Sequence, residues 1–325
     1  MSVNKLSGHC AARYFDFQLA RARKLFLKLA SRHLGITITR KQYYGRPIAD
    51  KERGNKLISD MIVSGKPFMI TRLGSVELGC MVGFLSKQIL GKQKYEDKIV
   101  AAMVNNAGFF PGDEERLDRF CRLMLEDMAL IDILGVWNIN LEDYLVKEFC
   151  NQSASLVTLG AIDPFHVDLP WSSFLENRKV LVIHPYGCSI RNQYQKRSLL
   201  YPGTSILPQF DLKVITAVQS IAGTETEFAD WFEALGAMQN AIADTDFDIA
   251  LIGAGAYGLP LAAYVKSLGK QAIHMGGTLQ LLFGIMGKRW DTSEHATKYY
   301  NEHWTRPLPS ETPAGAAKVE KGCYW

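Results

Sequence analysis

The chain of 325 residues lacks the features that mark several large classes of protein. Its six cysteines include no Cys-x-x-Cys pair, which argues against a zinc knuckle or a disulfide framework and favours a reducing environment. No apolar run reaches the roughly 18 residues expected of a membrane-spanning helix. The first residues also lack the apolar core and the cleavage site of a signal peptide. These absences lead us to expect a cytoplasmic protein.

Signatures of several enzyme classes are missing as well. The sequence contains no HExxH metalloprotease motif, no GxSxG nucleophile elbow, no P-loop and no protein-kinase signature set. The net charge of +4 is modest for this length, so it gives no sign of the clustered basic face that nucleic-acid binding requires. We expect no nucleic-acid partner, whereas small molecules that carry phosphate remain compatible with this charge.

From about residue 66 onward, short β-branched runs alternate with stretches of helical pattern. The runs predict seven strands, at residues 67–72, 130–137, 154–160, 179–185, 212–218, 248–253 and 271–276. Helices are expected at residues 75–89, 113–127, 141–151, 224–243, 258–268 and 278–286, with Ser75, Asp113 and Thr224 as caps. This alternation is typical of an α/β fold with a Rossmann-like, mostly parallel sheet sandwiched by helices.

The composition divides the chain into three parts. Residues 1–45 form an N-terminal segment in which 13–34 has apolar residues at helical spacing with basic residues between them. Such an amphipathic helix can dock on its own domain, dock on a second subunit as part of a homodimer, or lie on an anionic membrane surface. Residues 46–290 form the expected Rossmann-like catalytic domain. Residues 291–325 are polar and proline-rich, and we expect an extended tail laid over that domain.

Ligands of open α/β sheets bind beyond the carboxyl ends of the strands, so the residues that follow each strand are the candidates for chemistry. After the first expected strand come Arg72, Gly74, Ser75 and Glu77. Gly74 permits a tight turn, the amides of the first helical turn favour an anion, and the guanidinium of Arg72 matches phosphate oxygens. A helix start with Glu77 placed favourably on the helix dipole explains the same residues without a ligand.

A glycine-rich turn follows the apolar run that ends at Ile252. Gly253, Gly255 and Gly258 satisfy G-x-G-x-x-G between a strand and a helix, which predicts close approach of a diphosphate. A nicotinamide-binding fold would have a carboxylate at the end of the next strand, but that position offers His274, Gly276 and Gly277. The turn therefore favours a nucleotide or pyrophosphate over NAD, unless the glycines serve only the packing of helix on sheet.

Two histidines and one amide-rich loop complete the candidates. His184, followed by Tyr186, and His274 each end an expected strand, where an imidazole can donate to a phosphate or act as a general base. A hydrogen-bonded structural histidine is the alternative for both. The loop that contains Asn106 and Phe109 offers an amide and a flat aromatic face that suit a sugar acceptor, although its composition is also that of an ordinary turn.

With these residues identified, the chain resembles the bacterial GT-D fold glycosyltransferases. The group has an Arg-x-Gly-Asp-x-Glu turn after its first strand, where this chain has Arg72-Leu-Gly74-Ser75-Val-Glu77, and a C-terminal strand, Gly-containing turn, helix and second strand like the segment from 249 to 277. The resemblance implies that a nucleotide-sugar donor, such as a UDP-sugar, meets the following residues: Arg72, Gly74, Ser75, Tyr186, Gly253, Gly255, Tyr257, Gly258, Gly276, Gly277 and Gln280.

One departure from the group concerns the metal. The Asp-x-Glu pair of the group is taken to hold a divalent cation beside the diphosphate, but here Ser75 stands at the Asp position, and a hydroxyl is a poorer ligand for Mn²⁺ or Mg²⁺ than a carboxylate. Glu77 then contacts the metal, contacts the donor, or serves as the base for the acceptor hydroxyl. His184 or His274 would stabilise the leaving group where no metal does.

The resemblance implies transfer of the sugar to an acceptor of the bacterial cell surface, such as a capsule, O-antigen or related polysaccharide. A glycan acceptor that is lipid-linked would also explain contact of the basic N-terminal helix with the inner face of the inner membrane. Two other functions remain open from the residues. A non-catalytic nucleotide- or glycan-binding protein would fit Ser75, and a nucleotide-cofactor oxidoreductase would fit G-x-G-x-x-G but not the missing carboxylate.

Overall fold

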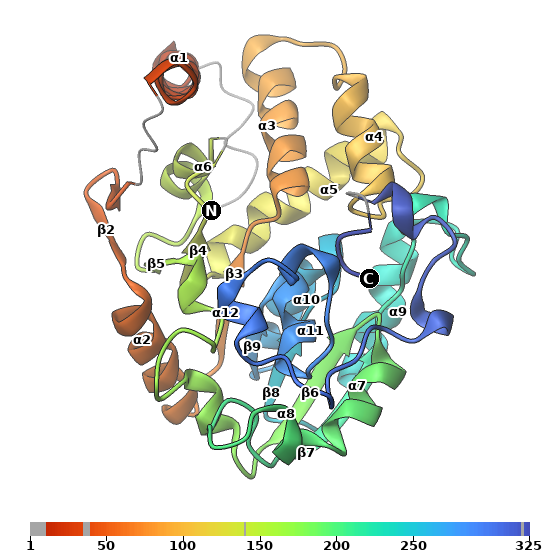
Figure 1. Cartoon of the computed structure of the whole chain (residues 1–325). Helices are drawn as coiled ribbons and strands as arrows, with labels where there is room; N and C mark the ends of the chain where they lie inside the picture. The colour runs from red at the N-terminus through yellow and green to blue at the C-terminus, as the bar shows by residue number, and fades with distance from the viewer. Residues whose placement is uncertain (1–10, 35–39, 140, 320–321) are drawn as a thin grey trace.

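The computed structural model describes the whole chain except residues 1–10, 35–39, 140 and 320–321 (Figure 1). Its centre is a nine-stranded sheet in the order β1-β2-β5-β4-β3-β9-β8-β6-β7, in which only the pair β1 and β2 is antiparallel. The strands are β1 (Gln42–Tyr43), β2 (Arg46–Ala49), β3 (Phe68–Arg72), β4 (Ile133–Val136), β5 (Ser155–Thr158), β6 (Lys179–His184), β7 (Asp211–Thr216), β8 (Ile249–Ile252) and β9 (Gln271–His274). This is an α/β fold of the Rossmann-like kind, as expected.

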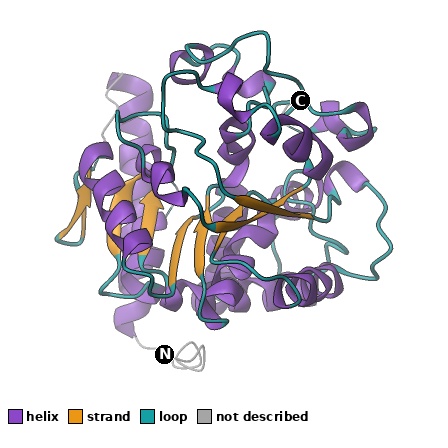
Figure 2. Cartoon of the chain, turned by 90° about the horizontal axis from the view of Figure 1, so that it is seen from below, coloured by secondary structure: helices purple, strands orange, loops and turns teal. Residues whose placement is uncertain are grey.

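Helices cover both faces of the sheet (Figure 2). They are α1 (Ala11–Leu34), α2 (Lys51–Val63), α3 (Ser75–Leu90), α4 (Asp97–Asn105), α5 (Glu114–Asp127), α6 (Glu142–Phe149), α7 (Gly187–Tyr194), α8 (Arg197–Leu200), α9 (Trp231–Ala243), α10 (Gly258–Ser267), α11 (Leu279–Leu282) and α12 (Glu294–Thr297). Successive strand residues alternate between two cores, as strand geometry requires. Leu181 belongs to the core that includes buried residues of α3, α5, α9 and α10, while Val180 and Val182 belong to the core that includes buried residues of α2 and α7.

All seven expected strands are present. The hairpin of β1 and β2 was not expected, because strands of two and four residues have no apolar run that a pattern could detect. Two expected caps were wrong. Helix α9 begins at Trp231, since the Asp230 carboxylate, not Thr224, accepts from the amides of the first turn. Ser75 is the first residue of α3, and Gly74 is its N-cap.

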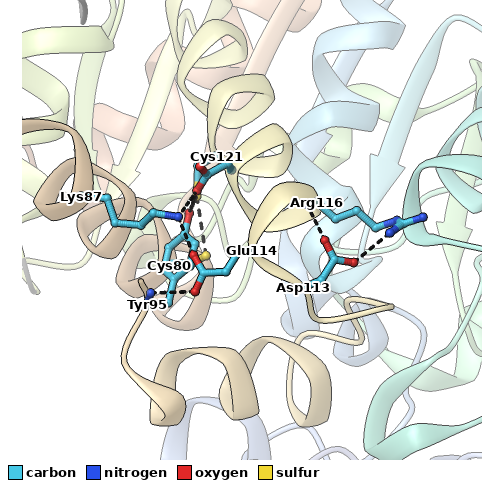
Figure 3. A network of polar contacts seen from close by, with 8 residues as sticks. Cys80, Lys87, Tyr95, Asp113, Glu114, Arg116 and Cys121 are labelled. Carbon is cyan, nitrogen blue, oxygen red and sulfur yellow. Dashed lines mark hydrogen bonds and ion pairs between the residues drawn. The ribbon is translucent and has the colours of Figure 1, made fainter. Parts of the chain in front are cut away.

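A polar network joins α3, the loop that precedes α4, and α5 (Figure 3). The Lys87 ammonium donates to Glu114 at 2.5 Å and to Asp118 at 2.9 Å, and the Tyr95 hydroxyl donates to Asp118 at 2.8 Å. The Sγ atoms of the free cysteines Cys80 and Cys121 lie 3.6 Å apart at the same place. Because Lys87 is largely covered and has two carboxylate partners, the network fixes α3 against α5 more firmly than a surface ion pair would.

The loop between α4 and α5 is anchored by aromatic packing. Phe109 is fully buried, with its ring 5.3 Å from that of Phe120 and 5.5 Å from that of Trp231. Phe109 therefore does not lie where we expected a residue that touches a sugar acceptor, because no part of its side chain reaches solvent in this structure. The aromatic character that we interpreted as a sugar platform instead supplies packing under the loop.

We expect Phe109→Ala to lower the free energy of unfolding by about 3–5 kcal/mol, the usual cost of removing a buried phenyl ring and leaving a cavity. Urea unfolding followed by circular dichroism measures this loss. Phe15→Ala is the matched control: its ring is 67% exposed, so the same substitution should change stability by less than about 0.5 kcal/mol. Equal stabilities of the two variants would contradict a packing role for Phe109.

Candidate functional site

A cavity of about 420 Å³ lies over the carboxyl ends of the central strands. It is lined by residues at the ends of six adjacent strands, in sheet order β4, β3, β9, β8, β6 and β7. This is where open α/β sheets bind ligands, because the loops that leave neighbouring parallel strands meet at one edge. The cavity therefore unites segments from residue 72 to residue 325.

Most of the residues singled out from the sequence meet in this one cavity. Those that line it are Arg72, Gly74, Ser75, Glu77, Asn106, His184, Tyr186, Gly253, Gly255, Tyr257, His274, Gly276, Gly277 and Gln280. Phe109 and Gly258 do not line it. Phe109 is part of the core, and Gly258 lies behind the His274 ring.

Arg72 is the cation at the end of β3. Its guanidinium carbon lies 4.3 Å from the centre of the Trp137 ring, a cation–π contact that orients the group. Burial lowers the pKa of Arg72, and the negative charges of Glu77 and Asp163 oppose this shift. An arginine stays charged under any ordinary condition, so the cavity holds a partly desolvated positive charge that favours an anionic ligand.

Glu142 positions the loop that carries Trp137. One oxygen of its buried carboxylate, Oε2, accepts hydrogen bonds from the amides of Trp137 and Asn138, each at 2.9 Å, and from the Tyr43 hydroxyl at 2.8 Å. Burial raises the pKa of Glu142, while these three donors and Arg72 lower it. Trp137 follows β4 directly, so a strand-end position is the signal that identifies it, although the apolar run that predicts a strand at 130–137 includes this residue.

The first turn of α3 forms the wall beside Arg72. Glu77 folds back over the N-cap, and a Cβ added at Gly74 would lie 1.7 Å from Glu77 Oε2. Glycine is therefore required at position 74 to let the carboxylate lie against the backbone. The exposed Ser75 and the positive end of the helix dipole face the cavity beside this carboxylate.

The two histidines are buried and electrically neutral. Burial lowers the pKa of His184 to about 3, and burial together with the charge of Arg72 lowers the pKa of His274 to about 3. His184 Nδ1 accepts from the Tyr186 amide at 3.0 Å, so its proton is on Nε2. With such pKa values, either histidine is a weak base at neutral pH. His184 can offer a ligand the N–H of Nε2, whereas both ring nitrogens of His274 are enclosed by the fold, Nδ1 beside Thr71 and Nε2 beside Gly258.

The glycine-rich turn shapes the space around these rings. A Cβ at Gly258 would lie 2.1 Å from His274 Nε2, and a Cβ at Gly253 would lie 2.7 Å from His184 Cδ2. Gly255 adopts φ +54° and lines the cavity. Two glycines of the G-x-G-x-x-G pattern thus leave room for imidazole rings. The sequence pattern alone does not distinguish this packing role from diphosphate binding.

The C-terminal segment closes the cavity, which the sequence did not indicate. Tyr324 and Trp325 line it together with Arg289. The Gln280 amide donates to the Tyr324 carbonyl at 3.1 Å, the Arg289 amide donates to the Cys323 carbonyl at 2.8 Å, and the Arg289 guanidinium donates to the Tyr324 hydroxyl at 3.1 Å. We expected residues 291–325 to form an extended tail laid over the domain, but in addition the end of this segment forms a wall of the cavity.

The described residues do not form a metal site by themselves. Among them, no group of three or more His, Cys, Asp or Glu side chains is placed to hold a cation. Glu77 is the one acidic side chain among the residues that line the cavity. A divalent cation there would need ligand oxygens from elsewhere, such as a bound diphosphate.

We expect Gly258→Ala to displace the His274 ring and to lower the melting temperature, because the new methyl group would overlap the imidazole. Gly236→Ala is the matched control, since a Cβ at Gly236, inside α9, meets nothing within 4 Å. That control should keep or raise stability by up to about 1 kcal/mol through helix propensity. Differential scanning fluorimetry of both variants checks the contrast, and equal melting temperatures would rule out the tight contact.

The neutral histidines should also make the fold acid-sensitive. A histidine whose folded pKa is about 3 stays neutral as pH falls below 6.5, while the unfolded chain takes up the proton, so stability is lost between these values. Each histidine lowers the free energy of unfolding by up to about 1.4 kcal/mol for each pH unit below 6.5 in that window. Urea unfolding of His184→Gln at pH 7 and pH 4.5 should show a smaller loss than the original chain. The same loss in both chains would mean that His184 titrates normally.

A scan against models of protein families, a search of curated protein sequences and a search of solved structures found no match for this chain.

Proposed function

We propose that the chain is a glycosyltransferase that binds a nucleoside-diphosphate sugar, most simply a UDP-sugar, in the central cavity. The observation that carries the proposal is the meeting of two arginines, the start of α3 and a glycine-rich turn around one cavity at the carboxyl edge of the sheet. Each of these features favours a phosphorylated ligand. The resemblance of Arg72-Leu-Gly74-Ser75-Val-Glu77 to the motif of GT-D glycosyltransferases agrees with this class of donor.

The surroundings divide into a charged and an aromatic part. Arg72, Arg289 and the amides of the first turn of α3 would hold the diphosphate, while Trp137 and Tyr324 supply flat faces for a base or a sugar ring. No carboxylate follows β9, where an enzyme that uses NAD would hold the ribose hydroxyls. This absence favours a nucleotide sugar over a nicotinamide cofactor.

The proposed chemistry uses Glu77 and the arginines. In the reaction, a bond forms between the acceptor oxygen and the anomeric carbon, and the bond between that carbon and the diphosphate oxygen breaks. The hydroxyl proton passes to the Glu77 carboxylate, and the charge that develops on the diphosphate is stabilised by the guanidinium groups. Mn²⁺ or Mg²⁺, where bound through the diphosphate, would add to that stabilisation. Asn106 lines the cavity, where its amide would contact the acceptor, which we expect to be a bacterial surface glycan.

A ligand screen by thermal shift tests the donor class, because a ligand that binds only the folded chain raises its melting temperature. The ligands are UDP, GDP, CMP and NAD with their sugar conjugates where these exist, each with and without Mn²⁺. Stabilisation by one nucleotide and its sugar, followed by release of the nucleotide in the presence of a glycan acceptor, is the expected result. Binding without release indicates a non-catalytic binding protein, and stabilisation by NAD alone contradicts the proposal.

Arg72→Lys should weaken binding of the stabilising nucleotide by about 10- to 100-fold, because an ammonium cannot replace the two-pronged contact of a guanidinium. Isothermal titration calorimetry measures the dissociation constant. Arg53→Lys, at an exposed position of α2, is the control and should bind as the original chain does. An unchanged affinity of Arg72→Lys would place the diphosphate elsewhere.

A further inference from the structure

Helix α1 lies at the periphery of the molecule, beside α3 and α6 (Figure 1). A small part of its surface faces the domain: Phe17 and Ala20 are buried, and Phe17 contacts the Tyr144 ring of α6 at 5.1 Å between centroids. Two ion pairs attach the helix at the flanks, Asp16 with Lys147 at 2.7 Å and Arg23 with Asp143. One face of α1 is thus fixed, and its orientation on the domain is set.

The opposite face of α1 is apolar and exposed. At 100° per residue, Phe15, Leu19, Phe26 and Leu29 fall within an arc of roughly 80°. Phe15 is 67% and Phe26 is 69% exposed, and Leu19 is 58% exposed. Tyr14 and Leu25 widen the same surface. An apolar face of this length on a helix whose other face is already docked marks an interaction surface.

The charge around this face is almost entirely positive. The sequence of α1 holds a single acid, Asp16, which is paired with Lys147, against six arginines and lysines. A groove of about 510 Å³ runs between α1 and α3, and the charged residues that line it are Arg21, Lys24, Lys92 and Lys94 with Glu96 alone opposing them. Basic residues therefore flank the apolar face and continue onto the loop after α3.

We propose that α1 and the adjoining groove dock the protein on an anionic phospholipid surface, with the apolar face in the interface and the basic groove on the lipid headgroups. A second copy of the chain fits less well, because two such helices would bring arginines and lysines together without acids to pair with them. Anionic lipid supplies the missing negative charge. No helix in the described part of the chain is long and apolar enough to cross a bilayer, so α1 lies in the surface and does not span it.

The observations that support the docking surface are separate from those that support the proposed function. The groove and the central cavity are nevertheless close in space. Val76 of α3 lines the central cavity, while Gly79, Gly83 and Ser86 of the same helix line the groove. Ten residues of helix separate Val76 from Ser86, about 15 Å at 1.5 Å per residue. The membrane surface would therefore lie within one helix length of the cavity, close enough to meet an acceptor held in the bilayer.

Co-sedimentation of the full chain with vesicles tests the proposal. We expect binding to vesicles of phosphatidylcholine mixed with phosphatidylglycerol, weaker binding to phosphatidylcholine alone, and release by salt. The double variant Phe15→Ser, Phe26→Ser should lose affinity for the mixed vesicles by at least about tenfold. Arg21→Gln with Lys94→Gln should lose about fivefold for each charge removed. Leu169→Ser with Leu199→Ser changes exposed apolar residues elsewhere and should bind like the original chain.

The same variants show whether a substitution damages the fold and whether the surface instead binds a second copy of the chain. Melting temperatures should agree across the variants, because every changed side chain on α1 is at least partly exposed. The affinity for UDP should also be unchanged, so a failure of nucleotide binding would count against the proposed function and leave the docking surface untouched. No binding to the mixed vesicles, or an equal loss in the control pair, overturns the proposal. A dimer in light scattering that Phe15→Ser, Phe26→Ser dissociates, without vesicle binding, would assign the surface to a second copy.

Discussion

The parallel pairing of β3 with β9 is the contact on which the site depends. Phe68 pairs with Gln271 and Ile70 with Ile273, so two segments about 200 residues apart in sequence run side by side. The Gln271 side chain strengthens the start of this pair by donating to the carbonyls of Ile62 and Lys66, each at 3.2 Å. Because the register is fixed there, Arg72 at the end of β3 arrives beside His274 and Gly276 at the end of β9.

The same pairing explains the electrostatics of the cavity. Arg72 and His274 are brought together in a region with little water, and the arginine keeps its charge while the histidine loses its proton. Thr71, one residue before Arg72, meets His274 Nδ1 at 2.9 Å and holds the ring in place. The result is a cavity with a fixed positive charge from Arg72 beside an uncharged imidazole, which favours an anionic ligand over a cation.

Much of this arrangement could be predicted from the sequence, for a physical reason. Buried parallel strands are short apolar runs, and ligands of such sheets bind where the strands end, so the pattern alone indicates Arg72, His184, Gly253 and His274 as candidates. The features that were missed depend on contacts between distant segments. Tyr324 and Trp325 reach the cavity from a polar tail, and no local periodicity indicates where such a tail packs.

Two of the residues that the sequence suggests for ligand contact have a role in the fold. The Phe109 ring fills space under a loop, and Gly258 leaves space for an imidazole. Residue type tells which interactions are possible, while burial decides which one is made. Glu142 shows the converse, because its carboxylate never faces a ligand and yet fixes the loop that brings Trp137 against Arg72.

Helix α3 connects the central cavity with the groove beside α1. Its first turn faces the central cavity, its middle lines the basic groove beside α1, and Lys87 near its end ties it to α5 through Glu114 and Asp118. Contacts hold this helix in place at both ends, since its start follows β3 directly and its end carries the ion pairs of Lys87. The distance along α3 between a ligand in the groove and a ligand in the cavity would therefore be set by the fold and not by either ligand.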